Sequence, residues 1–241
     1  MYQGRCQLVK RNGAVGGKSV QYSAVSRHHL ATVALGSLLG LLFLLPEPVD
    51  AWTIPTRIEM ADYALRVAPP HLVGQVERHQ KKYHAGIKAA AKHDPRAKSS
   101  AAAVDIDSIV QIEVDRAVHS IVEHEPFSEI VFRLGVVAYW VASANDPLAS
   151  IHPPYSQDYS RYLQDASRRF AVLYYGHDRR FESTAELEAL IERSLDRGLM
   201  MAPQVADEYR RIGEIDGLKL FDDRSTAFGI GSVAFSHGVS D

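Results

Sequence analysis

The stretch RLGVVAYWVASANDPLA, residues 133–149, closes the most hydrophobic segment of the chain downstream of residue 51. Between residues 130 and 142 a single charged side chain, Arg133, interrupts the apolar run. A helix that is apolar on nearly all sides packs in the interior of a protein rather than on its surface. Asn145-Asp146-Pro147 then supplies a helix end. The sequence therefore predicts a buried, central helix over residues 127–144.

Apolar residues recur at helical spacing on both sides of this segment, and Pro, Gly and polar stretches separate the resulting pieces. We find no internal repeat and no alternating strand pattern longer than a few residues. The predicted fold class is all-α, with six to eight helices. The other expected helices span residues 56–67, 71–91, 107–124, 159–174, 183–199, 205–212 and 225–241, and residues 92–104 are expected to form a loop.

Local signals refine two of these helices. Thr56 followed by Glu59 is a capping-box signature, so Thr56 is the expected N-cap of the first helix. Asp107 or Ser108 is the expected cap of the helix that ends near residue 124. The buried stripe of that helix is expected to contain Val110, Val114, Val118, Ile121 and Val122.

Composition indicates an ordinary globular protein. The chain has 241 residues, of which 46% are hydrophobic and 23% charged, and this suits a single folded domain. The 27 basic and 29 acidic residues divide unevenly, because residues 1–51 hold five basic and two acidic ones. The remaining body, with 22 basic and 27 acidic residues, is mildly acidic, which argues against nucleic-acid binding through a basic surface.

The first 51 residues have the layout of a signal peptide. Basic residues precede an uncharged apolar core, Leu30–Leu45, and Val49-Asp50-Ala51 fits a small-residue cleavage site. We expect cleavage after Ala51, a mature chain from Trp52 to Asp241, and a periplasmic or extracellular location. An uncleaved membrane anchor is the alternative, although about 20 residues are needed to span a bilayer. The single cysteine, Cys6, lies in the leader, so the mature chain would contain no disulfide.

A mature chain that begins with Trp, followed by a helix and by RLGVVAYWVASANDPLA, resembles the zinc-dependent phospholipase C and S1/P1 nuclease superfamily. The family pattern L-G-x-x-x-H-x-x-x-D-x-N-x-P-x-H places Leu134, Gly135, Asn145 and Pro147 in register. The tail FDDRSTAFGIGSVAFSH resembles the bacterial phospholipase-C-like branch. The resemblance implies a multi-helix phospholipase C/P1 nuclease-like fold over residues 52–241. It also implies a site in which the amino group and carbonyl oxygen of the terminal Trp bind zinc.

The side chains that would bind zinc in such a site are missing here. Arginine stands where the family's first histidine follows Trp by five residues, and neither tyrosine, serine nor alanine supplies a good zinc ligand at neutral pH. We therefore expect a remnant pocket with no catalytic residue and no metal. Its residues are Trp52, Arg57, Tyr139, Ser143, Ala149 and Tyr159, and Leu163 stands at a further ligand position.

Three functions stay open on this basis. The first is a non-catalytic binding module for a phosphate ester, a phospholipid headgroup or a protein partner, with Arg57 holding an anion. The second is an active zinc-dependent phosphodiester hydrolase whose ligands have moved to Asp146, His152 and Asp158. The third is a structural helical domain that touches a membrane only through its leader.

Overall fold

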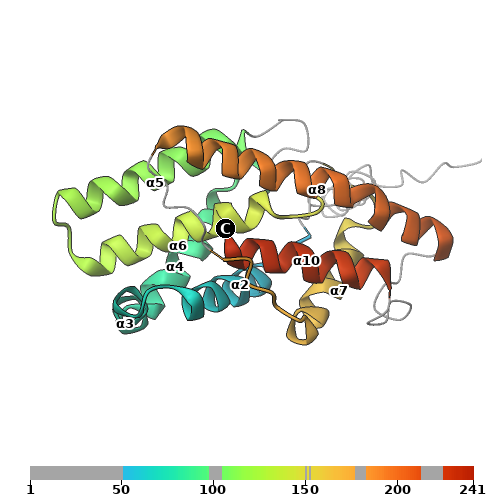
Figure 1. Cartoon of the computed structure of the whole chain (residues 1–241), viewed down its shortest axis with the longest axis horizontal. Helices are drawn as coiled ribbons and strands as arrows, with labels where there is room; N and C mark the ends of the chain where they lie inside the picture. Colours follow the sequence, from blue (N-terminus) through green and yellow to red (C-terminus); the bar gives the residue numbers. More distant parts are fainter. Residues whose placement is uncertain (1–50, 98–104, 150, 152, 177–182, 213–224) are drawn as a thin grey trace, which may run out of the picture. The chain divides into compact units, whose positions relative to one another are not determined.

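The structure is a computed structural model of the chain, and it describes residues 51–97, 105–149, 151, 153–176, 183–212 and 225–241. All of these residues belong to one compact unit, Glu47–Asp241, while a second unit, Met1–Pro46, falls outside the described part. The expected signal peptide, residues 1–51, also lies outside the described residues, except for Ala51. In the described ranges, helices are the sole regular secondary structure (Figure 1). The prediction of an all-α protein is confirmed.

Eight α-helices and two short 3-10 helices lie in the described ranges. They are α2 (Ile54–Val67), α3 (Pro70–Arg78), α4 (Gln80–His93), η1 (Pro95–Ala97), α5 (Ile106–Val122), α6 (Phe127–Ala144), α7 (Ser156–Ala166), η2 (Ser167–Arg169), α8 (Thr184–Ile212) and α10 (Thr226–Ser240).

Helix α6 is the central element of this unit, with the bounds that the sequence predicted. It contacts α2, α4, α5, α8 and α10. Within the described residues, α6 also meets the length and composition of a membrane-spanning helix, and 44% of it is buried inside the protein. A core helix passes the same test as a membrane helix, so the packing of α6 accounts for its hydrophobicity.

Helices α4 and α6 cross with their backbones in contact. A Cβ atom on Gly86 of α4 would lie 2.0 Å from the carbonyl oxygen of Phe132, and one on Gly135 of α6 would lie 2.1 Å from the carbonyl oxygen of Tyr83. Both distances are far below any real Cβ contact, so this crossing requires glycine on both helices. Gly135, which the resemblance places in register, thus has a structural reason to be glycine.

The N-terminus of α2 corrects the predicted cap. The N-cap is Thr53, whose side chain accepts a hydrogen bond from the backbone nitrogen of Thr56, and the helix begins at Ile54. Pro55 sits in the first turn, where its missing N–H costs no helical hydrogen bond. Glu59 does not complete a capping box; its carboxylate accepts a hydrogen bond from Ser167 Oγ at 2.7 Å.

Other helix boundaries also differ from the prediction. The expected helix over residues 71–91 divides at His79 into α3 and α4. The cap of α5 is Asp105, whose side chain accepts from the backbone nitrogen of Ser108, rather than Asp107 or Ser108. The helix expected over residues 159–174 is α7, which begins and ends earlier.

The two helices expected over residues 183–199 and 205–212 form the single helix α8, with Pro203 inside it. Proline removes one helical hydrogen bond, a cost that tertiary packing can offset. Ile191, Ala202 and Val205 of α8 are buried against the rest of the domain. This burial explains why the helix continues past Pro203.

The predicted buried stripe of α5 is largely wrong. Val110 is buried, but Val118, Ile121 and Val122 are 51%, 53% and 62% exposed. The face that packs inward carries Ile106, Val110, Ala117 and Ser120 instead. Beyond α5, His124 takes a positive φ of 55°, and this left-handed residue turns the chain into α6.

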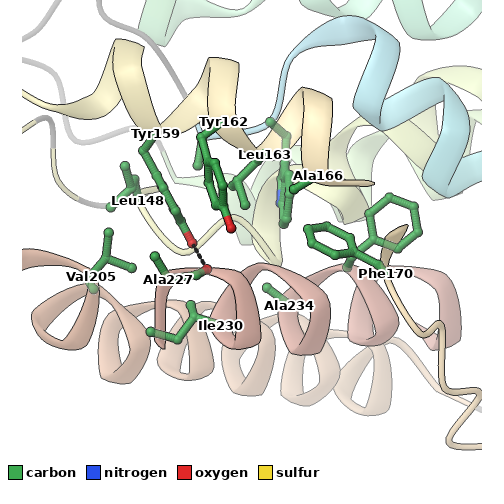
Figure 2. Packing of buried hydrophobic residues seen from close by; sticks show 14 of the residues in the cluster. Leu148, Tyr159, Tyr162, Leu163, Ala166, Phe170, Val205, Ala227, Ile230 and Ala234 are labelled. Atoms are coloured by element: carbon green, nitrogen blue, oxygen red, sulfur yellow. Dashed lines mark hydrogen bonds between the residues drawn. The ribbon is translucent and has the colours of Figure 1, made fainter. Parts of the chain in front are cut away.

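Buried side chains form two clusters. One, the first core, lies between α2, α7, α8 and α10, and Figure 2 shows α7 packing onto α10 within it. The other, the second core, joins α4, α5 and α6 with single residues of α2, α3 and α8. Helix α6 contributes Ala142 to the first core and Tyr139 and Trp140 to the second, so it connects the two.

Candidate functional site

The residues next to the predicted cleavage point meet the C-terminal half of α6. Trp52 immediately precedes α2, and Arg57 lies in the first turn of that helix, where its backbone nitrogen bonds to the carbonyl oxygen of Thr53 at 3.0 Å. Tyr139 and Ser143 are four residues apart on α6 and therefore share one face. The structure brings these four predicted residues together, and all four side chains are buried.

Trp52 is held through both of its backbone polar atoms and its indole. Its backbone nitrogen donates a hydrogen bond to Asp146 Oδ2 at 3.1 Å. Its carbonyl oxygen accepts one from Arg57 Nε at 3.1 Å, and its indole nitrogen donates to the carbonyl oxygen of Asn145 at 3.4 Å. The residue is 2% exposed, so the interior of the domain fixes its position.

Arg57 is 2% exposed and is surrounded by partners. Besides Trp52, its guanidinium donates to Ser143 Oγ, and its Nη2 lies 3.7 Å from Asp146 Oδ2. Its Cζ lies 4.3 Å from the centre of the Tyr139 ring, within the range of a cation–π interaction. A buried guanidinium is tolerated when it is paired and hydrogen-bonded in this way.

The network continues through Tyr139 to a second buried ion pair. The Tyr139 hydroxyl donates to Asp94 Oδ2 at 2.7 Å, and Arg96 Nη2 lies 2.6 Å from the same oxygen. Arg96 also donates through its backbone nitrogen to Asp94 Oδ1 at 2.8 Å. Burial alone would raise the pKa of Asp94, but hydrogen bonds from Arg96 and Tyr139 and the charge of Arg96 outweigh it and hold the pKa below its usual range.

Two arginines and two aspartates thus form one buried network, which we call the ion network: Arg57, Arg96, Asp94 and Asp146, linked by Tyr139, Ser143 and the backbone of Trp52. The expectation from the sequence is that Arg57 holds an anion in a remnant pocket. An anion would have to displace its present partners from a side chain that solvent hardly touches.

The other predicted pocket residues belong to the packed interior rather than to this network. Ala149 is half-buried and packs against the second core. Tyr159 is fully buried in the first core, and its hydroxyl donates to the carbonyl oxygen of Ala227 at 3.0 Å (Figure 2). Burial raises the pKa of that hydroxyl well above its usual value. Leu163, one turn along α7, is likewise fully buried among the residues that α7 packs onto α10 (Figure 2).

Two of the three alternative zinc ligands, Asp146 and Asp158, are hydrogen-bonded to other groups. Asp146 Oδ1 accepts from the backbone nitrogen of Leu148 at 2.8 Å, while its Oδ2 faces Trp52 and Arg57. Asp158 Oδ2 accepts from the Tyr209 hydroxyl at 2.5 Å. His152 lies outside the described residues. Among the residues that the structure describes, no group of three or more His, Cys, Asp or Glu side chains lies close enough together to hold a metal ion.

Sequence reasoning missed Asp94 and Arg96, and it considered Asp146 only as a zinc ligand of the alternative reading, not as a partner of Arg57. Asp94 and Arg96 fall in the segment predicted as a loop, with Pro95 between them. The signal that could have identified this ion pair is the placement of an acid and a base on either side of Pro95. The short helix η1 brings the two charges into contact and turns them toward α6.

Comparison of the chain with protein-family models, with curated proteins and with solved structures gave no match. The resemblance to the zinc-dependent phospholipase C and S1/P1 nuclease superfamily therefore rests on the sequence pattern around residues 133–149 and on Trp52.

Proposed function

We propose that this chain is an exported binding domain without phosphodiesterase activity, on a scaffold that resembles the zinc-dependent phospholipase C and S1/P1 nuclease superfamily. The observation that carries this proposal is the ion network. Arg57, Tyr139 and Ser143 stand at the positions of zinc ligands in the family pattern. All three are buried, and the guanidinium of Arg57 donates to Ser143 Oγ and lies over the ring of Tyr139.

The chemistry of these side chains does not fit zinc. Structural and catalytic zinc sites use imidazole, thiolate or carboxylate groups, in sets of three or four. Here the positively charged guanidinium of Arg57 would repel a dication at short range. Among the described residues, the carboxylate of Asp146 lies beside this guanidinium and already pairs with it.

The ion network supplies contacts to Trp52 that the resemblance assigns to a metal. In the family, zinc binds the amino group and the carbonyl oxygen of the terminal Trp. In this chain Asp146 accepts from the nitrogen of Trp52, and Arg57 donates to its oxygen. After cleavage behind Ala51, the nitrogen would be an ammonium group, and its hydrogen bond to Asp146 would become charge-assisted. A carboxylate and a guanidinium can therefore anchor the terminus without a metal.

The ligand of the proposed binding domain is a phosphate ester, a phospholipid headgroup or a protein partner. Because Arg57 is buried, such a ligand would bind to other side chains of the domain. The scaffold alone does not select among these ligands, because phospholipases and nucleases share it.

The test is elemental analysis of the purified mature protein, combined with thermal unfolding and a phosphodiester hydrolysis assay. We expect no stoichiometric zinc, an unchanged unfolding temperature in the presence of a chelator, and no release of phosphocholine or nucleotides with or without added zinc. About one bound zinc per chain, lost on chelation together with stability, would contradict the proposal. Activity that disappears in both Asp158→Asn and His152→Ala would establish the relocated zinc site instead.

A further inference from the structure

An apolar cavity of about 200 Å³ lies between α2, α3, α4, α6 and the end of α10. It shares no lining side chain with the ion network. Its walls consist mainly of aliphatic side chains. The lining residues are Met60, Ala61, Ala64, Leu65, Leu72, Val76, Tyr83, Leu134, Val137, Ala138, Val141, Ala142, Gly238 and Asp241.

The lining residues differ in exposure, so the cavity has a buried floor and a mouth that faces solvent. Met60, Val76 and Ala142 are at most 3% exposed and form the floor. Ala64, Leu72 and Ala138 are among the half-buried residues at the mouth. The cavity therefore reaches from solvent into the apolar interior. Its space exists because alanines on α2 and α6 stand where larger side chains would fill the gap between the helices.

The charge of the lining restricts what can enter. No Lys, Arg or His contributes to the wall, as far as the described residues line it. The one charged lining side chain is Asp241, whose carboxylate is held by Arg197, Ser194 and Asn145. The other polar lining side chain is Tyr83. Its hydroxyl is uncharged at neutral pH, and burial and the nearby Asp62 raise its pKa further above the usual value.

We propose that this cavity binds an uncharged hydrocarbon group of about six to eight carbon atoms, either a small aromatic ring or a short aliphatic chain. An apolar cavity of about 150 Å³ in a protein stays free of water and binds benzene, so the volume here suits a group of this size. A carboxylate or phosphate on such a ligand would lose its hydration and find no Lys, Arg or His among the described lining residues to pair with. Uncharged ligands should therefore bind in preference to anionic ones.

This inference does not depend on the proposed function, because its readout involves neither zinc nor phosphodiester hydrolysis. The full chain is titrated with benzene and 1-hexanol as uncharged probes and with hexanoate as an anion of similar length. Binding is measured by the shift of the unfolding temperature and by calorimetric titration. We expect a saturable rise of the unfolding temperature with both uncharged probes, and binding of hexanoate at least about tenfold weaker than that of 1-hexanol.

The variant that tests the site is Ala138→Leu, which places a larger side chain at the mouth. Ala89→Leu is the matched control, since Ala89 is half-buried on α4 and does not line the cavity. Ala138→Leu should abolish the response to benzene and 1-hexanol, whereas Ala89→Leu should keep it. If circular dichroism shows that Ala138→Leu does not fold, Ala64→Leu takes its place. Absence of saturable binding in the unmodified chain overturns the proposal, as do equal binding of hexanoate and a full response in a folded cavity variant.

Discussion

The backbone nitrogen of Trp52 donates a hydrogen bond to the carboxylate of Asp146 across 3.1 Å, although 94 residues separate them in the sequence. The same carboxylate oxygen lies 3.7 Å from Arg57 Nη2. One buried aspartate thus contacts both Trp52, the predicted first residue of the mature chain, and the cation beside it. Removal of the Asp146 carboxylate should therefore cost most of the stability that the ion network gives the domain.

Asp146→Asn should lower the free energy of unfolding by about 3–5 kcal/mol, because it removes the carboxylate that pairs with the buried guanidinium of Arg57. Urea denaturation measures this difference. The matched control is Asp165→Asn, whose side chain is 74% exposed and pairs with Arg169 only at 3.8 Å. The control should change stability by less than about 0.5 kcal/mol. Equal effects of the two substitutions would contradict the role given to Asp146.

Arg57 and Asp146 should be energetically coupled. We expect the double variant Arg57→Met/Asp146→Asn to be more stable than the sum of the two single effects predicts, by about 1 kcal/mol or more. The reason is that each single variant removes one member of the Arg57–Asp146 ion pair and leaves the other, whereas the double variant removes both charges of that pair. A double-mutant cycle on the free energy of unfolding measures the coupling. Strict additivity would show that the two side chains do not act as a pair.

Asp94 should make the domain sensitive to acid. Its pKa in the folded state lies below the value of about 3.9 for an unfolded chain, so the unfolded state binds more protons as the pH falls. Its contribution to stability is complete above about pH 4 and is lost as the pH drops through the folded-state pKa. Asp94→Asn should flatten this loss in urea denaturation curves recorded below about pH 4. An unchanged pH dependence in that variant would argue against Asp94 as the source.

Two glycine substitutions should have opposite effects, because Gly135 lies at the close crossing of α4 and α6 whereas Gly74 in α3 has open space around it. Gly135→Ala should destabilise the domain by at least about 1–3 kcal/mol, because the new methyl group would collide with the backbone of Tyr83. Gly74→Ala in α3 has nothing within 4 Å of the new Cβ atom and should stabilise by up to about 1 kcal/mol through helix propensity. Thermal unfolding of both variants measures the contrast. A neutral Gly135→Ala would show that the crossing can relax.

The position of the mature N-terminus is a separate prediction from the leader sequence. N-terminal sequencing of the exported protein should begin Trp-Thr-Ile-Pro. A secreted or membrane-bound chain that retains residues 30–51 would show an uncleaved anchor, and the proposed ammonium group at Trp52 would not exist.

The sequence predicted the parts of the fold in which local pattern and tertiary packing agree. Helix α6 is apolar on most of its surface and is buried by five neighbouring helices, so its bounds and its central place followed from composition. The spacing of Tyr139 and Ser143 on one helix face followed from the helical repeat. That Arg57 belongs to the same site as Trp52 was predicted from the family pattern, and no physical signal in the sequence indicated it.

The parts that were wrong or missed depend on contacts between distant segments. Val118, Ile121 and Val122 are apolar and regularly spaced, yet the partners of α5 lie on the face of Ala117 and Ser120. Asp94 and Arg96 carry no periodic pattern, and their meeting with Tyr139 depends on how α4 crosses α6. Hydrophobic periodicity gives the type of an element, whereas the choice of face and the pairing of charges depend on the assembled fold.

The burial of Ala51 and Trp52, at 0% and 2% exposure, sets an order of events for the proposed maturation. A peptidase needs a few residues of accessible, extended backbone on both sides of the bond that it cuts, and the folded domain does not offer this at residues 51–52 without local unfolding. If the chain is cut after Ala51, the cut has to come before the domain folds around residues 51 and 52. A precursor that folds first would conceal its own cleavage site, and the rate of folding would then compete with the rate of processing.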